Sequence, residues 1–228
     1  MPPNPPDLSI VVPVAPGEQA WPGLLSRLDE AGAMDGCDEA CEIVLAAAEP
    51  APPSLPAAVR WIEGPFGRAA QLNRGACAAR GAALWFLHAD SRPDPEAIVA
   101  ARTWPVQESR LAWFDLAFGD DGPPAVRLNA AGANFRSRWL GLPFGDQGLL
   151  CSRMLFDELG GFDEDFGLGE DLDFVVRARR SGARLQRLPG TVVTSARRYR
   201  RHGWLSTSAR HAWLTMRLWL RSRRRAAE

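Results

Sequence analysis

Short apolar runs alternate with amphipathic segments through the first part of the chain. Four runs rich in β-branched or aromatic side chains are typical of buried strands, namely residues 8–14, 41–47, 57–63 and 83–89. Residues 18–32 carry apolar side chains at helical spacing, and residues 67–81 form a small-residue segment that predicts a helix ending at Gly81. This alternation predicts an α/β fold with a mostly parallel central sheet and helices on both faces.

The second half of the chain continues with both kinds of element. Strands are predicted over residues 110–118, 143–152, 183–189 and 191–199, and helices over residues 124–141, 153–162 and 169–182. No linker separates independent units, which predicts a single domain. We expect a Pro-rich leader (1–7), a domain over 8–202 with halves 8–92 and 93–202, and an amphipathic basic helix (203–228).

The fourth predicted strand ends on an imidazole and a carboxylate. His88 and Asp90 follow the apolar residues of this strand directly, and a Ser-Arg-Pro sequence comes next. Ligands of open α/β sheets bind beyond the carboxyl ends of the strands. The position of this polar pair therefore predicts a ligand site at that edge.

Composition narrows the class of protein. The chain has 228 residues, of which 46% are hydrophobic and 24% are charged, as in an ordinary globular protein. The formal net charge of +0 argues against a dedicated nucleic-acid binder. The chain has no lysine, which excludes a lysine Schiff base or a lysine general base.

Compartment follows from the cysteines and from the first residues. The four cysteines form no C-x-x-C pair, and free thiols in a reducing compartment are expected. The first residues, MPPNPPDL, lack the pattern of a signal peptide, and no apolar run has the length of a membrane span. These features predict a cytoplasmic protein.

The last segment combines apolar and basic side chains. Its apolar members are Trp204, Leu205, Trp213, Leu214, Met216, Leu218, Trp219 and Leu220, and its basic members are Arg221, Arg223, Arg224 and Arg225. A basic, Trp-rich helix can lie on an anionic membrane surface, which would give a peripheral contact with the inner face of the membrane. The preferred interpretation is that the helix packs on the domain and that the arginines are a solvated end.

Two stretches together resemble the family 2 glycosyltransferases. The first is GRAAQLNRGACAARGAALWFLHAD (67–90), and the second is GGFDEDFGLGEDLDFVVRARRSG (160–182). LSIVVPV is similar to the first strand of that family, and His-Ala-Asp in place of Asp-x-Asp, with GDQ and TSARR, looks most like a short bacterial branch. The resemblance implies a GT-A (Rossmann-like) fold. It also implies an inverting, hexosyltransferase-like enzyme that takes a sugar from a nucleotide-sugar donor, a UDP-sugar being expected, and transfers it to a hydroxyl of an unknown acceptor.

The same resemblance implies a metal site of Mg²⁺ or Mn²⁺ at His88 and Asp90. A cation held by Asp90 would stabilise the negative charge of a departing diphosphate, and one carboxylate can suffice for Mg²⁺. The alternative for Asp90 is a cap on the following turn. His88 is acceptable as a ligand for Mn²⁺, or it bonds a donor hydroxyl or a phosphate, or it is a core histidine bonded to a backbone carbonyl.

The resemblance places the catalytic base at Glu170 and Asp171. We expect Asp171 to be the base that takes the proton of the acceptor hydroxyl and Glu170 to orient the substrate or the base. Acidic residues at a helix start are also stabilised by the helix dipole, whatever their function. Asp173 lies on another helix face, which predicts a structural role.

Further candidates surround these residues. Arg68, at a predicted helix N-terminus, is a candidate to bind the nucleotide or diphosphate, and the alternative is a solvated surface arginine. Asn73 is expected to brace the loop that holds Asp90. Arg197 and Arg198 are candidates for the diphosphate, with a solvated charge pair as the alternative.

Asp146 and Gln147 are candidates for contact with the donor sugar or the acceptor. They follow a glycine at the entry of the predicted strand 143–152.

One departure from the family pattern favours alternatives to catalysis. Where the second strand of the family runs into an Asp-rich turn that bonds the nucleotide base, this chain has Ala46, Ala47 and Ala48, and Glu49 could substitute only if the loop bends back. A non-catalytic relative that binds a sugar or a partner protein is therefore the second hypothesis. A nucleotidyltransferase ranks last, because PVAPGEQAW offers Gly17 but no basic residue after the first strand.

Overall fold

The computed structural model describes residues 7–33, 41–106 and 109–197, together with seven positions beyond them: Trp204, Ser206, Ser208, Trp213, Met216, Arg217 and Leu220. The candidate Arg198, residues 1–6 of the predicted leader and most of the predicted helix 203–228 lie outside the described residues.

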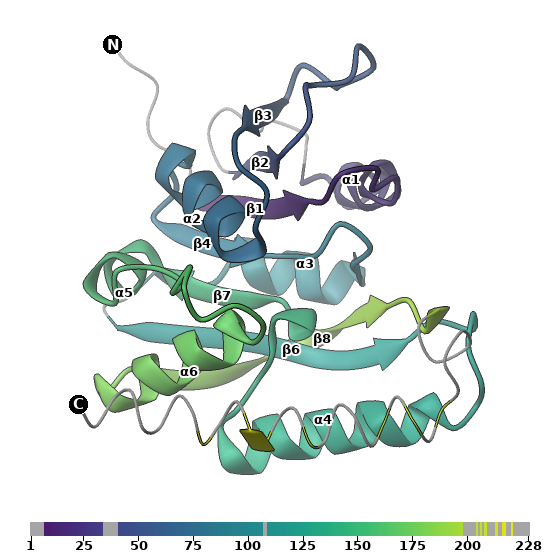
Figure 1. Cartoon of the computed structure of the whole chain (residues 1–228), viewed down its shortest axis with the longest axis vertical. Helices are drawn as coiled ribbons and strands as arrows, with labels where there is room; N and C mark the ends of the chain where they lie inside the picture. The colour runs from purple at the N-terminus through teal and green to yellow at the C-terminus, as the bar shows by residue number, and fades with distance from the viewer. Residues whose placement is uncertain are drawn as a thin grey trace.

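The described chain folds into one curled sheet with helices around it (Figure 1). The strands are β1 (Leu8–Val14), β2 (Cys41–Ala47), β3 (Val59–Glu63), β4 (Ala83–Phe86), β5 (Arg92–Pro93), β6 (Arg110–Phe118), β7 (Leu149–Ser152) and β8 (Arg184–Thr194). The helices are α1 (Trp21–Glu30), α2 (Arg68–Ala78), α3 (Pro95–Arg102), α4 (Val126–Leu140), α5 (Arg153–Glu158) and α6 (Glu170–Arg180), with a 3₁₀ turn, η1, at Gly145–Gln147.

The sheet is mixed. Its strand order is β3-β2-β1-β4-β7-β6-β8-β5. Strands β3, β2, β1 and β4 are parallel to one another, as are β6 and β8, whereas β7 runs antiparallel to both β4 and β6, and β5 antiparallel to β8. The α/β class is confirmed, and most of the described strands run in one direction, with β7 and β5 as the exceptions.

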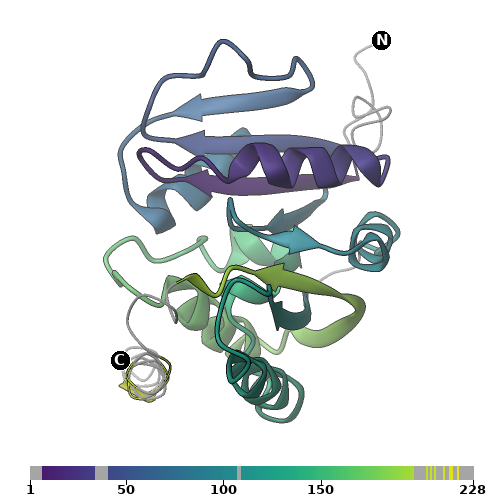
Figure 2. The same cartoon turned by 90° about the vertical axis from the view of Figure 1, so that its right-hand side faces the viewer.

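Two apolar layers lie on opposite faces of the sheet, because successive side chains of a strand point to opposite sides. Along β1, Leu8, Ile10, Val12 and Val14 pack with α1 and α3, whereas Val11 packs with α2, α5 and α6 on the other face. Figures 1 and 2 show α1 and α2 on opposite sides of β1. Helices on both faces are thus confirmed for the described residues.

Several element boundaries differ from the predictions. The segment predicted as one strand over 143–152 forms η1 first and becomes a strand only at Leu149. The two strands predicted over 183–189 and 191–199 are a single strand, β8, whose pairing with β6 shifts register between Trp113 and Asp115. Gly190 allows this because its φ is +91° and a Cβ there would overlap the backbone nitrogen of Ala97.

Helix α3 has a start signal that the sequence analysis did not use. Asp94 caps it, because its side chain accepts a hydrogen bond of 2.7 Å from the backbone N–H of Ala97, and Pro95 occupies the first helical position. The other Asp94 oxygen accepts from the backbone N–H of Thr191 at 3.0 Å. One side chain therefore starts α3 and ties it to β8.

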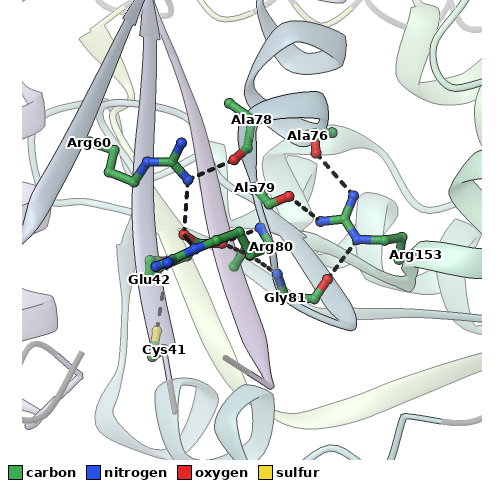
Figure 3. A network of polar contacts seen from close by, with 10 residues as sticks. Cys41, Glu42, Arg60, Ala76, Ala78, Ala79, Arg80, Gly81 and Arg153 are labelled. Atoms are coloured by element: carbon green, nitrogen blue, oxygen red, sulfur yellow. Dashed lines mark hydrogen bonds and ion pairs between the residues drawn. The ribbon is translucent and has the colours of Figure 1, made fainter. Parts of the chain in front are cut away.

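Helix α2 ends at Ala78, before the predicted Gly81, where Ala79 takes an extended conformation, and an arginine bonds the carbonyls around this end. Arg153 donates to the carbonyl oxygens of Ala76, Ala79 and Gly81 at 3.1, 2.9 and 2.8 Å (Figure 3). A cation at a helix C-terminus is favourable for the helix dipole, and it satisfies carbonyls that lack helical partners. The C-terminal end of α2 is thereby anchored to the junction of β7 and α5.

A buried carboxylate organises the same edge of the sheet. Glu42 is 3% exposed. It accepts hydrogen bonds from the Ser9 hydroxyl at 2.7 Å and from Arg60 and Arg80 at 3.2 Å each (Figure 3). Burial raises the pKa of Glu42, but the hydrogen bonds from Ser9, Arg80 and Arg60 lower it by more, so that the net pKa lies below the usual value.

Replacing Glu42 by Gln should reduce the free energy of unfolding at pH 7 by about 2–3 kcal/mol, because hydrogen bonds from charged donors to a buried carboxylate are lost. The folded-state pKa of Glu42 is below 4.5, so its contribution is complete above that pH and is lost as the pH falls through the folded-state pKa. Urea denaturation of both proteins at pH 7 and pH 3 measures this. The exposed Glu63→Gln is the control, and an equal loss at both pH values would contradict the account.

The beginning of the C-terminal segment contacts α4. The indole N–H of Trp204 donates to the side-chain oxygen of Asn129 at 2.6 Å, and the side chains of Asn129 and Ser208 are bonded at 2.9 Å. Farther along, Trp213, Met216 and Leu220 are exposed. In the described part of the chain, no helix is both long enough and apolar enough to cross a membrane.

Candidate functional site

Residues far apart in the sequence meet where the first strands end. Arg68 begins α2, His88 follows β4, and Glu170 and Asp171 begin α6. The Arg68 guanidinium is 3.1 Å from Glu170 Oε1 and 3.9 Å from Asp171 Oδ2, and its Nη2 contacts His88 Nε2. The two stretches that carry the family resemblance therefore form one cluster of charged side chains.

A glycine makes room for this cluster. Gly145, the first residue of η1, donates its backbone N–H to Asp171 Oδ2 at 2.7 Å. A Cβ at position 145 would lie 2.5 Å from Arg68 Nη2, 2.9 Å from Asp171 Oδ2 and 3.2 Å from His88 Nε2. A side chain at position 145 would therefore require Arg68 and Asp171 to move from this arrangement.

The two carboxylates of α6 differ in exposure. Glu170 is 1% exposed, and its Oε2 accepts from the backbone N–H of Gly169 at 3.1 Å. Burial raises the pKa of Glu170; the charge of Arg68 lowers it and that of Asp171 raises it, and the net shift is upward. The Asp171 side chain is 13% exposed and is oriented by the N–H groups of Gly145 and Leu172. Asp171 is therefore the carboxylate that a ligand can reach.

His88 lies in a tight turn after β4. Its backbone N–H donates to the Ser91 hydroxyl, and its carbonyl accepts from the Ser91 N–H, both at 3.0 Å. Arginine is always a donor, so the contact with Arg68 makes His88 Nε2 an acceptor, as in the neutral imidazole. A guanidinium at that nitrogen occupies the direction from which a metal ion would bind. In this arrangement, Nε2 of His88 does not fit a metal ligand.

Asp90 is presented by the same turn. Its side chain is 29% exposed and lies 3.7 Å from the guanidinium of Arg197, which follows β8 and donates through Nε to the Ser195 hydroxyl at 3.0 Å. Within the described residues, no group of three or more His, Cys, Asp and Glu side chains is arranged to hold a metal. The chemistry of this position fits a cation held by one carboxylate, with its other ligands coming from a phosphate group and water.

The prediction for Asn73 is wrong in its target. Asn73 holds the loop before α6: its side chain donates to the Phe162 carbonyl at 2.8 Å and accepts from the Phe162 N–H at 2.9 Å, and it donates to Glu164 at 2.9 Å. Gly161 has a φ of +73°, and a Cβ there would lie 2.7 Å from Asn73 Oδ1. Asn73 thus links α2 to the segment that leads into α6.

The structural role predicted for Asp173 fits its contacts. Asp173 accepts from Arg177, four residues later in α6, at 2.6 Å. Arg177 also donates to the carbonyls of Leu159 and Gly161 at 2.7 and 2.8 Å. The second resemblance stretch therefore combines residues of the charged cluster with residues that hold the loop in place.

Asp146 and Gln147 are adjacent but have different surroundings. Gln147 is fully buried, and its amide bonds the Ser137 hydroxyl and the Phe114 carbonyl, so it positions η1 and is not exposed to a ligand. Asp146 Oδ1 is buried without a hydrogen-bond partner among the described residues. Burial raises the pKa of Asp146 to about 6, and the charge of Asp171 raises it while those of Arg136 and Arg68 lower it.

Sequence reasoning missed three residues at this edge. Gln71 donates to the carbonyls of Val14 and Ala46 at 2.6 and 2.8 Å, which ties together the ends of β1 and β2. Its signal was a long polar side chain on the apolar side of a small-residue helix. Arg136 and Gly145 had no such signal, because only the fold brings α4 and η1 to the site.

The loop after β2 bends back toward the loop after β1, which brings Glu49 close to Gly17. Glu49 is exposed, and its Oε2 accepts from the backbone N–H of Gly17 at 3.0 Å. Ala46 and Ala47 are buried in β2 and offer no side-chain polar group. Glu49 is therefore an acidic side chain held beside the loop that follows β1.

No protein-family model matches the chain, and no curated protein matches it significantly.

The free energy of unfolding of Asp146→Asn, relative to that of the wild type, should be higher at pH 7.5 than at pH 4.5. The folded-state pKa is raised from 3.8 to about 6, so the folded protein holds this proton longer than the unfolded chain, and wild-type stability falls as the pH rises from about 4 through about 6. The variant lacks this loss, so the stability difference should grow by on the order of 2 kcal/mol over that range. Urea denaturation of both proteins measures it; the exposed Asp165→Asn is the control, and a pH-independent difference would contradict the raised pKa.

Proposed function

We propose that the protein is an inverting glycosyltransferase of the GT-A fold that transfers a sugar from a UDP-sugar to an acceptor hydroxyl. The observation that carries the proposal is the cluster of Arg68, His88, Glu170 and Asp171 at the carboxyl edge of β1 and β4. Clefts at this edge bind ligands in open α/β sheets. The members of this cluster come from the two stretches that resemble family 2 glycosyltransferases.

Asp171 is suited to act as the general base. The N–H groups of Gly145 and Leu172 hold its two oxygens at 2.7 and 2.8 Å, so its orientation is set before a substrate binds. An oriented carboxylate can take the proton of an acceptor hydroxyl as that oxygen attacks the anomeric carbon. The guanidinium of Arg68 lies 3.1 Å from Glu170 Oε1 and 3.9 Å from Asp171 Oδ2, so a positive charge adjoins the base.

The departing diphosphate needs positive charge. Arg197 and Asp90 lie together at the end of β8 and the turn after β4, and Asp90 would hold Mg²⁺ or Mn²⁺ there. When bound, the cation neutralises the charge on the diphosphate. Arg197, whose side chain is 56% exposed, can turn toward a phosphate oxygen.

A non-catalytic binding protein of the same fold remains the second candidate, because Ala46 and Ala47 give the nucleotide base no side-chain partner. Under the enzyme hypothesis, Glu49, beside Gly17, is a candidate to bind the base, or the base is held in another way. Calorimetric titration with UDP and MnCl₂ separates the two candidates: metal-dependent binding favours the enzyme.

Asp171→Asn and Asp90→Ala should affect different steps. With a panel of nucleotide sugars, Asp171→Asn should lower kcat for transfer or hydrolysis by about 100-fold or more and leave UDP affinity unchanged, because only the base is lost. Asp90→Ala should weaken metal-dependent UDP binding. Product formation and calorimetry measure these effects, with Asp165→Asn as the exposed control.

Two results would contradict this mechanism. Wild-type turnover in both Asp90→Ala and Asp171→Asn would exclude these carboxylates from the reaction. Binding of UDP without any turnover of a nucleotide sugar would favour the non-catalytic candidate.

The membrane contact and the cytoplasmic location stay predictions. Trp213, Met216 and Leu220 form an exposed apolar set with Arg217 among them, which suits an anionic lipid surface. The protein should sediment with phosphatidylglycerol-containing vesicles at low salt and less so at high salt. Trp213→Ala should weaken this and the exposed Val99→Ala should not; equal sedimentation with pure phosphatidylcholine vesicles would contradict the electrostatic part.

A further inference from the structure

Two buried atoms of opposite charge near Asp171 lack hydrogen-bond partners. They are Oδ1 of Asp146 and Nη2 of Arg136, and neither has a partner among the described residues. Buried polar groups in proteins are nearly always bonded to protein, water or a ligand. These two atoms beside the proposed base are therefore available to bond a water molecule or a ligand.

Arg136 is held rigidly from α4. Its guanidinium carbon lies 3.7 Å from the centroid of the Phe144 ring, and its Nε donates to the Leu142 carbonyl at 2.9 Å. Burial lowers the pKa of Arg136, while the charges of Asp146 and Asp171 raise it. The guanidinium therefore lies near the carboxylates of the site, with Nε bonded to the Leu142 carbonyl and Nη2 without a hydrogen bond among the described residues.

The two charges restrict what can bind. Asp146 is negative when ionised and would repel a phosphate, and Arg136 is positive and would repel a metal ion. A neutral group that both donates and accepts can satisfy both atoms at once, by donating to Asp146 Oδ1 and accepting from Arg136 Nη2. A hydroxyl has this capacity.

We infer that Arg136 and Asp146 form a binding subsite for a sugar hydroxyl beside Asp171. The inference rests on the proposed function and adds a recognition element to it. The hydroxyl belongs either to the donor sugar or to the acceptor, and both sources present the same chemistry. In either case the subsite positions a sugar next to the base.

The experiment uses the full chain with MnCl₂ and two variants. Arg136→Met removes the guanidinium and keeps an apolar stem on the Phe144 ring, and Asp146→Asn keeps the shape of the carboxylate. Arg138→Met is the matched control, because Arg138 lies on the same helix and pairs with Asp115 instead. Circular dichroism and thermal denaturation verify folding, and two variants at different positions guard against a local folding defect.

Calorimetry with UDP and with UDP-glucose, UDP-galactose and UDP-N-acetylglucosamine forms the first arm. Loss of about tenfold or more in affinity for a UDP-sugar, with UDP affinity retained, assigns the hydroxyl to the donor. The second arm titrates methyl glucoside and methyl galactoside into the UDP-loaded protein, observed by ligand NMR. Binding to the wild type and Arg138→Met, but not to the two variants, assigns the hydroxyl to the acceptor.

The inference is overturned if both variants bind UDP-sugars and methyl glycosides as the wild type does, or if the wild type binds no sugar in either arm. Failure of the proposed function has a different signature. If the wild type binds no UDP, the glycosyltransferase proposal fails, and glycoside binding that depends on Arg136 and Asp146 would then still support a sugar site.

Discussion

The candidate site depends on the contact of Arg68 with the buried carboxylate of Glu170. Glu170 is almost completely removed from water, and among the described residues Arg68 is the cation within ion-pair distance of it. Removing one partner of a buried ion pair leaves the other charge uncompensated and costs about 3–5 kcal/mol. The starts of α2 and α6 must therefore stay together, and this holds His88 and Asp171 in place beside them.

The rest of the fold keeps that contact in register. Arg153 fixes the far end of α2, and Asn73 fixes its middle to the loop before α6. Arg177 holds the same loop from the other side. Asn73 and Arg177 belong to the two stretches that carry the resemblance, but they lie outside the charged cluster. Their contacts orient α2 and α6 so that the first residues of these two helices meet.

Buried acids at the two edges of the sheet have opposite character. Glu42 is saturated with hydrogen bonds, and its pKa is lowered, as expected of a group that stabilises the fold in its charged form. Glu170 and Asp146 have raised pKa values, and Asp146 keeps an unbonded oxygen. The edge with Asp146 has a buried carboxylate oxygen without a hydrogen bond, which suits a ligand site. The edge with Glu42 has all its hydrogen bonds made within the protein, which suits a structural role.

The sequence alone determined the α/β class and the bounds of β1 and β2 through local periodicity, and it placed Arg68, His88 and Asp90 next to element ends. The candidacy of Glu170 and Asp171 came from the resemblance to family 2 glycosyltransferases. The antiparallel course of β7, the continuity of β8 through Pro189 and Gly190, and the true partner of Asn73 were decided only by the tertiary structure. So were the roles of Gly145 and Arg136, since a close backbone approach and an unpaired buried guanidinium exist only after distant segments pack. Local patterns record what each segment prefers; which side chains meet depends on how the sheet orders its strands.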